Sequence, residues 1–372
     1  MKSISPAWKK YKMDLTRRLL LSGLSGAALA ALPYNRRAWG NRKNTSVFIC
    51  GINCSGLEDT PPGIPTEEML HYYAAQGIRH IRLPGLWEHF QPQLGGELDA
   101  DYCHIYRSVI EQCRALKINV ICDPCHNYGH YRSQGQDLRL GDGNLTADLF
   151  ADFWKKFIHV FGDMPNISGL DLMGEPTNLP GPSIAEQSHI WQDAAQAAIT
   201  AIRQAGDKRP VWVEGYGSSS AAAWPTNNPM LHLLHDPLQR LVFSAHCYLD
   251  RDNSGTHYYW DEEVAAGDMV SGSALTADVG IKRITPFVEW LRDHGLNGNI
   301  GECGVGRQDR PDGQDDTGWL VALEKTIRFC YNNSLPFYYW GTGKDFGPSY
   351  PYGLEIDNGK TAPQWAILKK YL

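Results

Sequence analysis

Two glutamates stand at the ends of two short apolar segments, where their carboxylates could perform acid–base and nucleophilic chemistry together. The first segment, Gly169-Leu170-Asp171-Leu172-Met173-Gly174, is typical of a buried strand and ends at Glu175-Pro176, since proline interrupts strand pairing. The second segment, Asn299-Ile300-Gly301, ends in Glu302. A buried carboxylate is costly unless it has a partner or a function. At the carboxyl ends of two parallel strands the pair could face one pocket, the layout that glycoside hydrolysis requires.

Other predicted strands also end in polar or aromatic side chains that could serve such a site. Taken singly, each has a structural explanation: an ion-pair partner, a hydrogen-bonded histidine or a core ring. The same holds for the two glutamates, each of which could simply pair with an arginine and hold a loop. Together with the glutamates, however, these residues would converge from six strands on one face. They are Arg82, His126, Asn127, His246, Tyr248 and Trp340.

The elements that must position these residues alternate along the chain. Strand-like segments occur at 47–53, 78–83, 118–123, 168–173, 211–214, 241–246, 298–302 and 336–340. Amphipathic helical segments occur between them at 66–76, 101–116, 148–161, 184–205, 283–294 and 319–332. Alternating strands and helices indicate parallel pairing with right-handed crossovers. Eight strands, with no early glycine fingerprint for a dinucleotide, predict a single α/β domain at residues 46–372, folded as a (β/α)₈ TIM barrel.

Several short motifs resemble glycoside hydrolase family 5, the cellulase-like barrel enzymes. The matching pieces are Ile81-Arg82-Leu83-Pro84, His126-Asn127, Glu175-Pro176, His246-Cys247-Tyr248, Gly301-Glu302 and Trp340. The segment 246–257, with its H-x-Y-L-D-x-D-x-S-G-T pattern, is similar to the endo-β-1,4-glucanase branch of that family. The helical segment that ends at Gly206 is similar to the same branch. The resemblance covers about residues 47–372.

The resemblance implies a retaining two-glutamate mechanism on β-1,4-glucosidic bonds. Glu175 would be the general acid/base and Glu302 the nucleophile. Arg82 and Tyr248 would keep the nucleophile ionised by charge and hydrogen bonding, and the second carboxylate would raise the pKa of the acid. His126, Asn127 and His246 would bind sugar hydroxyls or orient the acid, and Trp340 would form the floor of the cleaved sugar's site.

One position departs from the family pattern. The family places asparagine before its acid/base glutamate, where it contacts the sugar 2-hydroxyl, but this chain has Gly174. Hydrogen bonds to that hydroxyl strengthen in the transition state. The loss therefore predicts slower cleavage of glucosides unless Asn127 or Asn178 supplies the missing donor. It also leaves the sugar's configuration at C2 open.

Aromatic residues are abundant, with Trp 12, Tyr 18 and Phe 11, and sugar-binding clefts use such rings as platforms. Four of them lie in or near predicted loops at the expected site face, where a packing role is an equal alternative: Trp87, Tyr128, Trp224 and Trp260. The absence of basic blocks argues against nucleic acid as a partner.

The first thirty residues read as a targeting segment. Six basic residues and one acid precede or begin an apolar run from Leu19 to Leu32, too short for a comfortable membrane span. Thr16-Arg17-Arg18-Leu19-Leu20-Leu21 resembles a twin-arginine export signal, with Ala28-Leu29-Ala30 as a cleavage site. We expect a signal peptide at 1–30, a linker at 31–45 and a periplasmic or secreted protein; an uncleaved anchor is the alternative. Cleavage would make the formal charge of −6 more negative, which suits a neutral substrate.

The nine cysteines are an odd number without zinc-type spacing. After export, one or two disulfides could form, with Cys103–Cys113 and Cys50–Cys54 as candidate pairs. His126 and His130 are four residues apart, but on an expected loop, so their spacing does not put them on one helix face. We expect neither metal nor cofactor.

The sequence leaves three functions open. The leading one is a monomeric endo-β-1,4-glucanase acting on cellulose or a related β-glucan, with no membrane association after signal cleavage. The second keeps the chemistry and changes the sugar or the mode, as in a mannanase or an exo-acting β-glycosidase, and Gly174 motivates it. The third is a sugar-binding protein that has lost catalysis, against which both glutamates and Arg82 argue.

Overall fold

The computed structural model describes residues 48–306, 317–344, 346, 350–355 and 361–372. The expected signal peptide and linker, and the first residues of the expected catalytic domain, lie outside these ranges. Within them no helix is long and apolar enough to cross a membrane.

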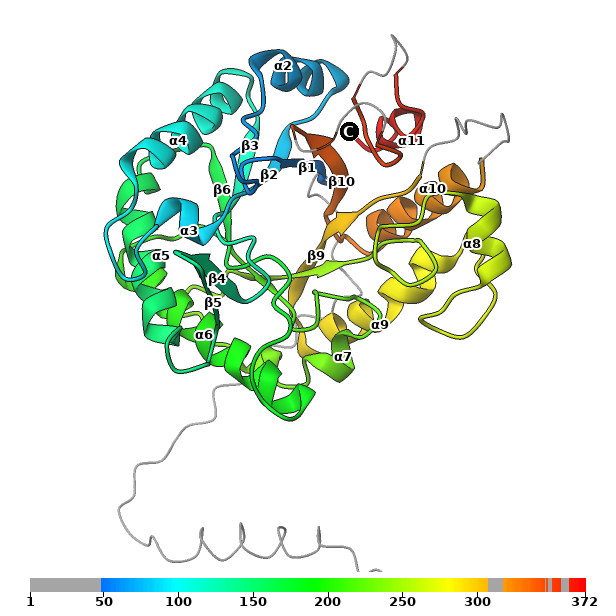
Figure 1. Ribbon diagram of the computed structural model, residues 1–372. Helices are drawn as coiled ribbons and strands as arrows, with labels where there is room; N and C mark the ends of the chain where they lie inside the picture. Colours follow the sequence, from blue (N-terminus) through cyan, green and yellow to red (C-terminus); the bar gives the residue numbers. More distant parts are fainter. Residues whose placement is uncertain (1–47, 307–316, 345, 347–349, 356–360) are drawn as a thin grey trace, which may run out of the picture. The chain divides into compact units, whose positions relative to one another are not determined.

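Eight parallel strands close into a barrel in the order β1-β10-β9-β8-β7-β6-β3-β2, ringed by helices (Figure 1). This confirms the predicted (β/α)₈ class. The strands are β1 (Cys50–Ser55), β2 (His80–Pro84), β3 (Asn119–Asp123), β6 (Ile167–Asp171), β7 (Val211–Glu214), β8 (Leu241–His246), β9 (Asn297–Cys303) and β10 (Phe337–Gly343). Because all eight run in one direction, their carboxyl ends share one rim.

The helices of the outer ring match the predicted amphipathic segments within a few residues. They are α2 (Glu67–Gln76), α4 (Ala100–Ala115), α5 (Ala147–Phe161), α6 (Ile184–Gln204), α9 (Val279–His294) and α10 (Thr317–Asn332). Thr66 is the N-cap of α2, and its hydroxyl accepts a hydrogen bond from the Met69 amide. The buried face of each helix packs on the strands and contributes to one continuous apolar core.

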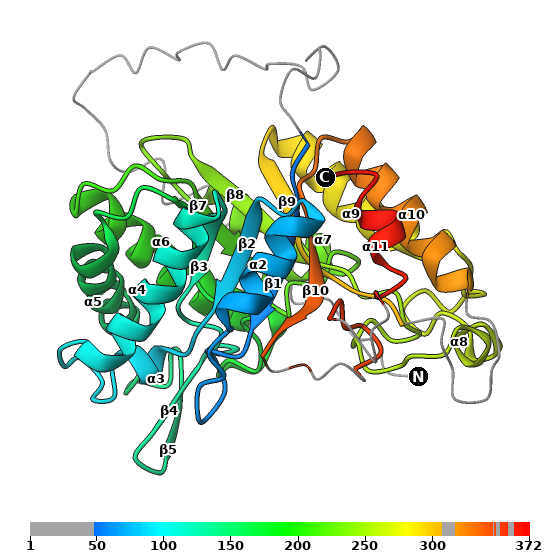
Figure 2. The same ribbon diagram turned by 90° about the horizontal axis from the view of Figure 1, so that it is seen from above.

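Shorter elements in the loops were not predicted from sequence. They are α3 (Trp87–Phe90), β4 (His130–Ser133), β5 (Gln136–Arg139), α7 (Trp224–Asn227), the 3₁₀ turn η3 (Leu231–Leu233), α8 (Trp260–Ala266) and α11 (Trp365–Leu368). The antiparallel β4–β5 hairpin follows β3 and projects beyond the barrel rim (Figure 2). These segments are too short to show a helical or strand period.

A separate apolar cluster fills the barrel interior, where Ile121, Trp212 and Tyr338 pack together. Gly51 leaves room for the tyrosine, since a Cβ there would lie 2.5 Å from the Tyr338 ring. Side chains alternate along a strand, so the residues two positions later also face the interior. This apolar layer therefore lies below the rim at the carboxyl ends of the strands. The polar side chains two positions later face the barrel interior at that rim, which is the mouth of the barrel.

All nine cysteines are buried free thiols, so the disulfides considered from sequence do not form. Cys103 and Cys113 are both on α4, and ten residues of helix separate them by about 15 Å. Cys50 and Cys54 are both on β1, four residues or about 13 Å apart. A disulfide requires Cα atoms within about 7 Å, which one straight element cannot provide at these spacings.

Candidate active site

Arg82, near the end of β2, is the centre of the polar cluster in the barrel mouth. Its side chain is fully buried, and its guanidinium also donates to the Asn53 side chain at 3.0 Å. Four carboxylates from four other strands or strand ends surround it: Asp123 at 2.9 Å, Asp171 at 2.7 Å, Glu214 at 2.7 Å and Glu302 at 2.8 Å. A fully buried cation needs such partners, and in return it fixes the carboxylates in one arrangement.

The two predicted glutamates meet at this cluster. Glu302 lies on β9, and Glu175 follows β6 by four residues. One carboxylate oxygen of each, and a ring nitrogen of His246, all lie within 4.8 Å of one another. The side chain of Glu175 is 18% exposed and that of Glu302 only 3%. Glu175 is thus the one of the pair that faces the opening.

The surroundings of Glu175 favour its protonated form. Burial raises the pKa of its carboxyl, and the nearby charges of Glu302 and Glu214 raise it further, while His246 opposes them. His246 Nδ1 lies 2.8 Å from Glu175 Oε1. The backbone of Glu175 has a φ of 50°, in the left-handed region that non-glycine residues rarely adopt. Such a conformation persists only where neighbouring contacts hold it.

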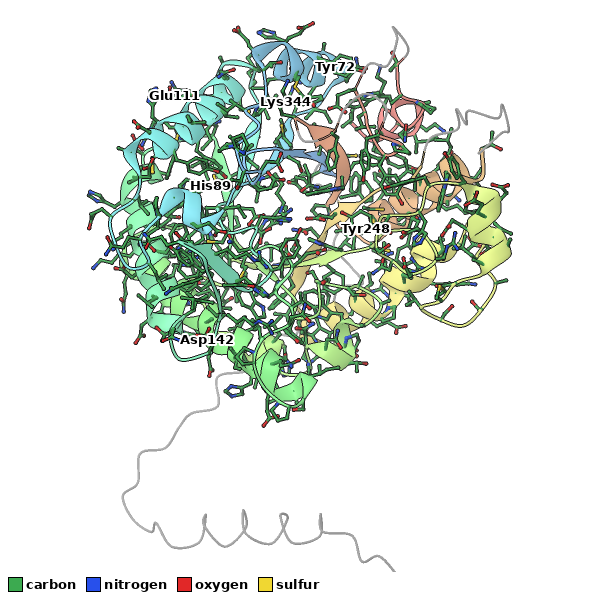
Figure 3. The ribbon with its side chains drawn as sticks, viewed as in Figure 1. Tyr72, His89, Glu111, Asp142, Tyr248 and Lys344 are labelled. Atoms are coloured by element: carbon green, nitrogen blue, oxygen red, sulfur yellow. The ribbon has the colours of Figure 1, made fainter. Side chains whose placement is uncertain are left out.

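The surroundings of Glu302 favour its ionised form. Burial alone would raise the pKa of Glu302, but the positive charges of His246, Arg82 and His126 together lower it below its usual value. The Tyr248 hydroxyl donates to Glu302 Oε2 at 2.7 Å and adds to the same effect. Figure 3 places Tyr248 beside the barrel opening rather than on the outer helices. One carboxyl is therefore poised to give a proton and its neighbour to act as an anion.

The ring of His126 occupies the space that a side chain at position 174 would need. A Cβ built on Gly174 would lie 2.2 Å from His126 Nδ1, closer than any real contact. That nitrogen also lies 2.8 Å from Asp123 Oδ2. Burial disfavours the charged ring, but Asp123 and Glu302 raise the pKa of His126 to about 9. The space that a side chain at position 174 would take is thus filled by the cationic ring of His126.

Aromatic rings line the same opening. Trp340 on β10 stacks on His126 with ring centroids 5.7 Å apart and an angle of 18° between the planes. Trp340 also contacts the ring of Phe346, with centroids 5.8 Å apart. Tyr128 is 38% exposed, and its hydroxyl lies 3.4 Å from His126 Nε2. Trp340 and His126 are nearly parallel, whereas Phe346 lies edge-on to Trp340 at 73° and Tyr128 edge-on to His126 at 71°.

Some predicted site residues point elsewhere. Asn127 is fully buried, and its amide group is occupied within the loop, where Oδ1 accepts the Trp87 amide at 2.8 Å and Nδ2 donates to Glu88. It is therefore not positioned to replace a donor at residue 174. Trp87 and Trp224 are fully buried in the core, and Trp260 packs on Trp319 of α10. Of the four loop aromatics, only Tyr128 reaches the mouth.

Sequence reasoning missed three residues of the cluster, namely Asp123, Asp171 and Glu214. All three are fully buried and contact Arg82. A detectable signal existed, since Glu214 ends an apolar strand just as Glu302 does. Asp171 is the last residue of β6 and lies within the strand segment expected at 168–173, where its charge is visible in the sequence but its partner is not.

In the described part of the chain, two clusters bring three potential metal ligands within 4.8 Å of one another. One is Glu175, His246 and Glu302, and the other is Asp250, Asp252 and His257. In both, the histidine Nδ1 already contacts carboxylates, at 2.8 Å from Glu175 and at 3.1 Å from Asp250. These contacts account for the clustering.

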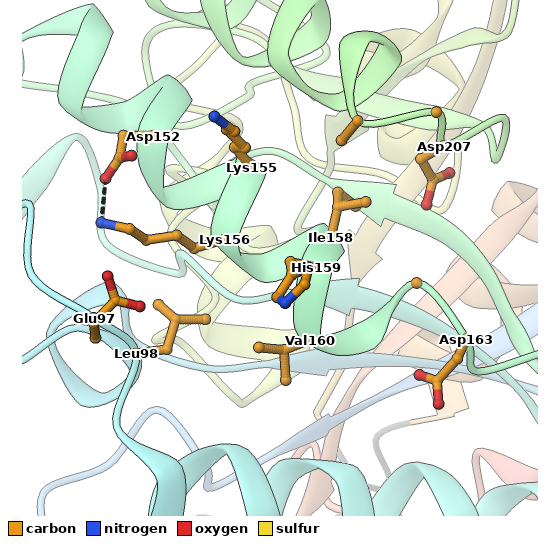
Figure 4. Close-up of a pocket in the computed structure, with 13 residues that line it drawn as sticks. Glu97, Leu98, Asp152, Lys155, Lys156, Ile158, His159, Val160, Asp163 and Asp207 are labelled. Atoms are coloured by element: carbon orange, nitrogen blue, oxygen red, sulfur yellow. Dashed lines mark hydrogen bonds and ion pairs between the residues drawn. The ribbon is translucent and has the colours of Figure 1, made fainter.

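A cavity of about 790 Å³ lies outside the barrel, between α5 and the loops that lead to α4, β6 and β7 (Figure 4). None of its lining residues belongs to a barrel strand. Its charged groups include Lys156, which bonds to Asp152 at 2.6 Å. It has no aromatic platform beyond His159 and no part in the cluster around Arg82.

Comparison with known proteins identifies the class to which this barrel and its paired carboxylates belong. The family model for cellulase (glycosyl hydrolase family 5) matches residues 41–345. Endo-beta-1,4-glucanase B of Aspergillus niger is 29% identical over 379 residues, which cover 97% of this chain and 100% of that protein.

Two solved structures are similar over most of their length. Pseudomonas stutzeri endoglucanase Cel5A, in complex with cellobiose, is 32% identical with a TM-score of 0.73, covering 87% of this chain and 92% of that one. XacCel5A in complex with cellopentaose is 30% identical with a TM-score of 0.73, covering 88% and 99%. Fold and site together define a glycoside hydrolase. The chain belongs to the cellulase family, glycosyl hydrolase family 5.

Proposed function

We propose that this protein is a retaining endo-β-1,4-glucanase in which Glu175 is the general acid/base and Glu302 the nucleophile. The observation that carries the proposal is the pair itself: carboxylate oxygens within 4.8 Å of each other, with the pKa of Glu175 raised and that of Glu302 lowered. Retaining glycosidases hold their carboxyl groups about 5–5.5 Å apart, whereas inverting enzymes need roughly 6.5–9.5 Å to admit a water molecule.

In the first half-reaction, an oxygen of the Glu302 carboxylate attacks the anomeric carbon. Glu175 gives its proton to the glycosidic oxygen as the bond from carbon to that oxygen breaks, and the leaving sugar departs as an alcohol. Arg82 and Tyr248 hold the attacking carboxylate ionised and oriented, at 2.8 and 2.7 Å. The product is a glycosyl ester of Glu302.

In the second half-reaction, the Glu175 carboxylate takes a proton from water. The water oxygen attacks the anomeric carbon, the ester bond to Glu302 breaks, and both glutamates return to their starting states. His246 keeps its proton through this cycle, because its pKa lies well above the usual value. Burial alone would lower that pKa, but the carboxylates of Glu214, Glu302 and Glu175 raise it. Two inversions at one carbon give net retention.

A β-1,4-glucan is the substrate that the relatives favour. Solved relatives hold cellobiose and cellopentaose, and the rings of Trp340 and Tyr128 beside the glutamates offer stacking surfaces for pyranose faces. The twin-arginine-type segment Thr16-Arg17-Arg18 supports export of the enzyme to meet this polymer.

The test is reducing-end release from a soluble cellulose derivative by wild type, Glu302→Gln and Glu175→Gln. We expect both substitutions to lower the rate by at least about a hundredfold, the lower range for removal of general acid–base catalysis. NMR of the first product from cellotetraose should show the β-anomer before mutarotation. Wild-type rates in Glu302→Gln, or initial formation of the α-anomer, would refute the mechanism.

A second candidate keeps this chemistry and changes the sugar at C2 or the mode of attack. This candidate is favoured because the cationic ring of His126 occupies the space where a side chain at position 174 would lie. Initial rates on cello-, manno- and xylo-oligosaccharides of equal length, with products separated by chromatography, distinguish the two. Faster cleavage of manno-oligosaccharides, or release of a single product size from the chain end, would select the second candidate.

A further inference from the structure

Glu214 is a fully buried carboxylate that the two-glutamate chemistry does not use. It is the last residue of β7, between the strands that lead to Glu175 and to His246. Its backbone carbonyl accepts the indole N–H of Trp191 on α6 at 2.7 Å, which anchors the strand end to the helical ring. The position of its carboxylate is thereby determined from outside the site.

Each oxygen of this carboxylate has a separate set of partners. Oε2 accepts the backbone N–H of Glu175 at 2.6 Å. Oε1 accepts an N–H of Arg82 at 2.7 Å and lies 3.1 Å from His246 Nε2. The His246 ring contacts Glu175 through its other nitrogen, Nδ1. Glu214 therefore approaches Glu175 in two ways, through the backbone and through the histidine.

The backbone contact falls at the strained residue. Glu175 has a φ of 50°, and its own N–H is the group that Glu214 accepts. A bond to that N–H fixes the orientation of the peptide plane that precedes the Glu175 side chain. The second contact is an ion pair. The Glu214 carboxylate lies 3.1 Å from Nε2 of the His246 ring, whose pKa Glu214 helps to raise, and the Nδ1 of the same ring lies 2.8 Å from Glu175.

We propose that Glu214 is a positioning residue for general acid catalysis. It holds the left-handed backbone of Glu175 through one oxygen and the charged His246 ring through the other, so that the Glu175 carboxyl is aimed at the leaving-group oxygen. The inference rests on the proposed role of Glu175 as the acid. Glu214 lies on β7, two positions after the interior residue Trp212, whereas the acid and the nucleophile come from other strands.

The test uses the sensitivity of the reaction to its leaving group. An alkyl leaving group, as in cellotetraose, needs the proton of Glu175, whereas the acidic phenol of 2,4-dinitrophenyl β-cellobioside leaves without it. The parameter measured for each substrate is kcat/KM, which reports only the first half-reaction of a double displacement. For Glu214→Gln we expect a loss of about 10- to 100-fold on cellotetraose, part of the 10²–10⁴ that acid catalysis supplies, and about threefold or less on the phenol.

Two further variants complete the experiment. Glu214→Asp keeps the charge but shortens the side chain by one methylene, so its carboxylate no longer reaches the Glu175 N–H. We therefore expect the same bias as in Glu214→Gln, a larger loss on cellotetraose than on the phenyl substrate. Asp236→Asn is the matched control, since Asp236 is also a buried carboxylate bonded to an arginine, Arg203, but on the outer ring. We expect it to lower the unfolding temperature and to leave the ratio of the two substrates unchanged.

The outcomes separate the two hypotheses. Equal losses on both substrates in folded Glu214→Gln and Glu214→Asp, or wild-type kinetics in both, would overturn the role of Glu214. Glu175→Gln serves as the reference. If it loses equal activity on both substrates, Glu175 is not the general acid, and the proposed function itself is refuted. A bias in Glu175→Gln without a bias in the Glu214 variants would leave the proposed function intact and remove this inference alone.

Discussion

Substitution of Gly174 by alanine tests the steric relation between this residue and His126. The added Cβ would lie 2.2 Å from His126 Nδ1, 2.8 Å from Cε1 and 2.9 Å from Cγ. No side chain tolerates such contacts, so the ring must move. The backbone at Gly174 needs no positive φ, which leaves the collision as the only penalty.

The magnitude follows from what the ring loses. Its Nδ1 contact with Asp123, at 2.8 Å, involves a cationic ring, and a hydrogen bond to a charged group contributes about 1.5–3 kcal/mol. If that energy is lost in the transition state, kcat/KM falls roughly 10- to 100-fold, since each 1.4 kcal/mol is about tenfold. Displacement of the cation also removes one of the charges that lower the pKa of Glu302. The acid limb of the rate profile should therefore move to higher pH.

The assay is a double-mutant cycle on cellotetraose with wild type, Gly174→Ala, His126→Ala and the double variant. Removal of the ring leaves room for the new Cβ, so alanine at 174 should cost nothing in the His126→Ala background, and the coupling should equal the single-mutant loss. If Gly174→Ala lowers kcat/KM by the same factor in both backgrounds, the steric argument is refuted.

Three further predictions concern the charges. The profile of kcat/KM against pH should have its acid limb below pH 4.5, where Glu302 with its lowered pKa gains a proton, and its alkaline limb above pH 4.5, where Glu175 with its raised pKa loses one. An acid limb above pH 4.5, or an alkaline limb below it, would contradict the assignment. Tyr248→Phe removes a 2.7 Å bond to the ionised Glu302, so we expect about a tenfold or greater loss, from about 1.5 kcal/mol or more, and a shift of the acid limb to higher pH; an unmoved limb would be evidence against that bond. Burial would raise the pKa of Asp236, but Arg203 and backbone amides lower it from 3.8 to about 2. This pair therefore contributes about 2 kcal/mol above pH 3.8 that is lost as the pH falls toward 2. Urea unfolding of Asp236→Asn should show that deficit at pH 7 and a much smaller one near pH 2.

Much of the architecture could be predicted because it depends on local patterns. Each barrel strand is a short apolar run, each ring helix has an apolar face, and their alternation leaves few topologies. Parallel strands share one rim, so Glu175 and Glu302 could be expected to meet although 127 positions separate them. The resemblance of short motifs added the expected roles of Arg82, Tyr248 and Trp340.

Other features depend on packing between distant segments, which no local pattern reports. The sequence shows Asp171 and Glu214 as charges in strands, but only the closed barrel brings them to one guanidinium. Trp87 and Trp224 could equally have been platforms or core, and the tertiary structure buries both.

The contrast is clearest around residue 174. The sequence by itself determined that the acid/base candidate Glu175 is preceded by a residue without a side chain. Only the tertiary structure decided what fills that space, because the ring of His126 comes from the loop after another strand, β3. A strand period specifies which way a side chain points, whereas the neighbour it meets depends on how the barrel closes.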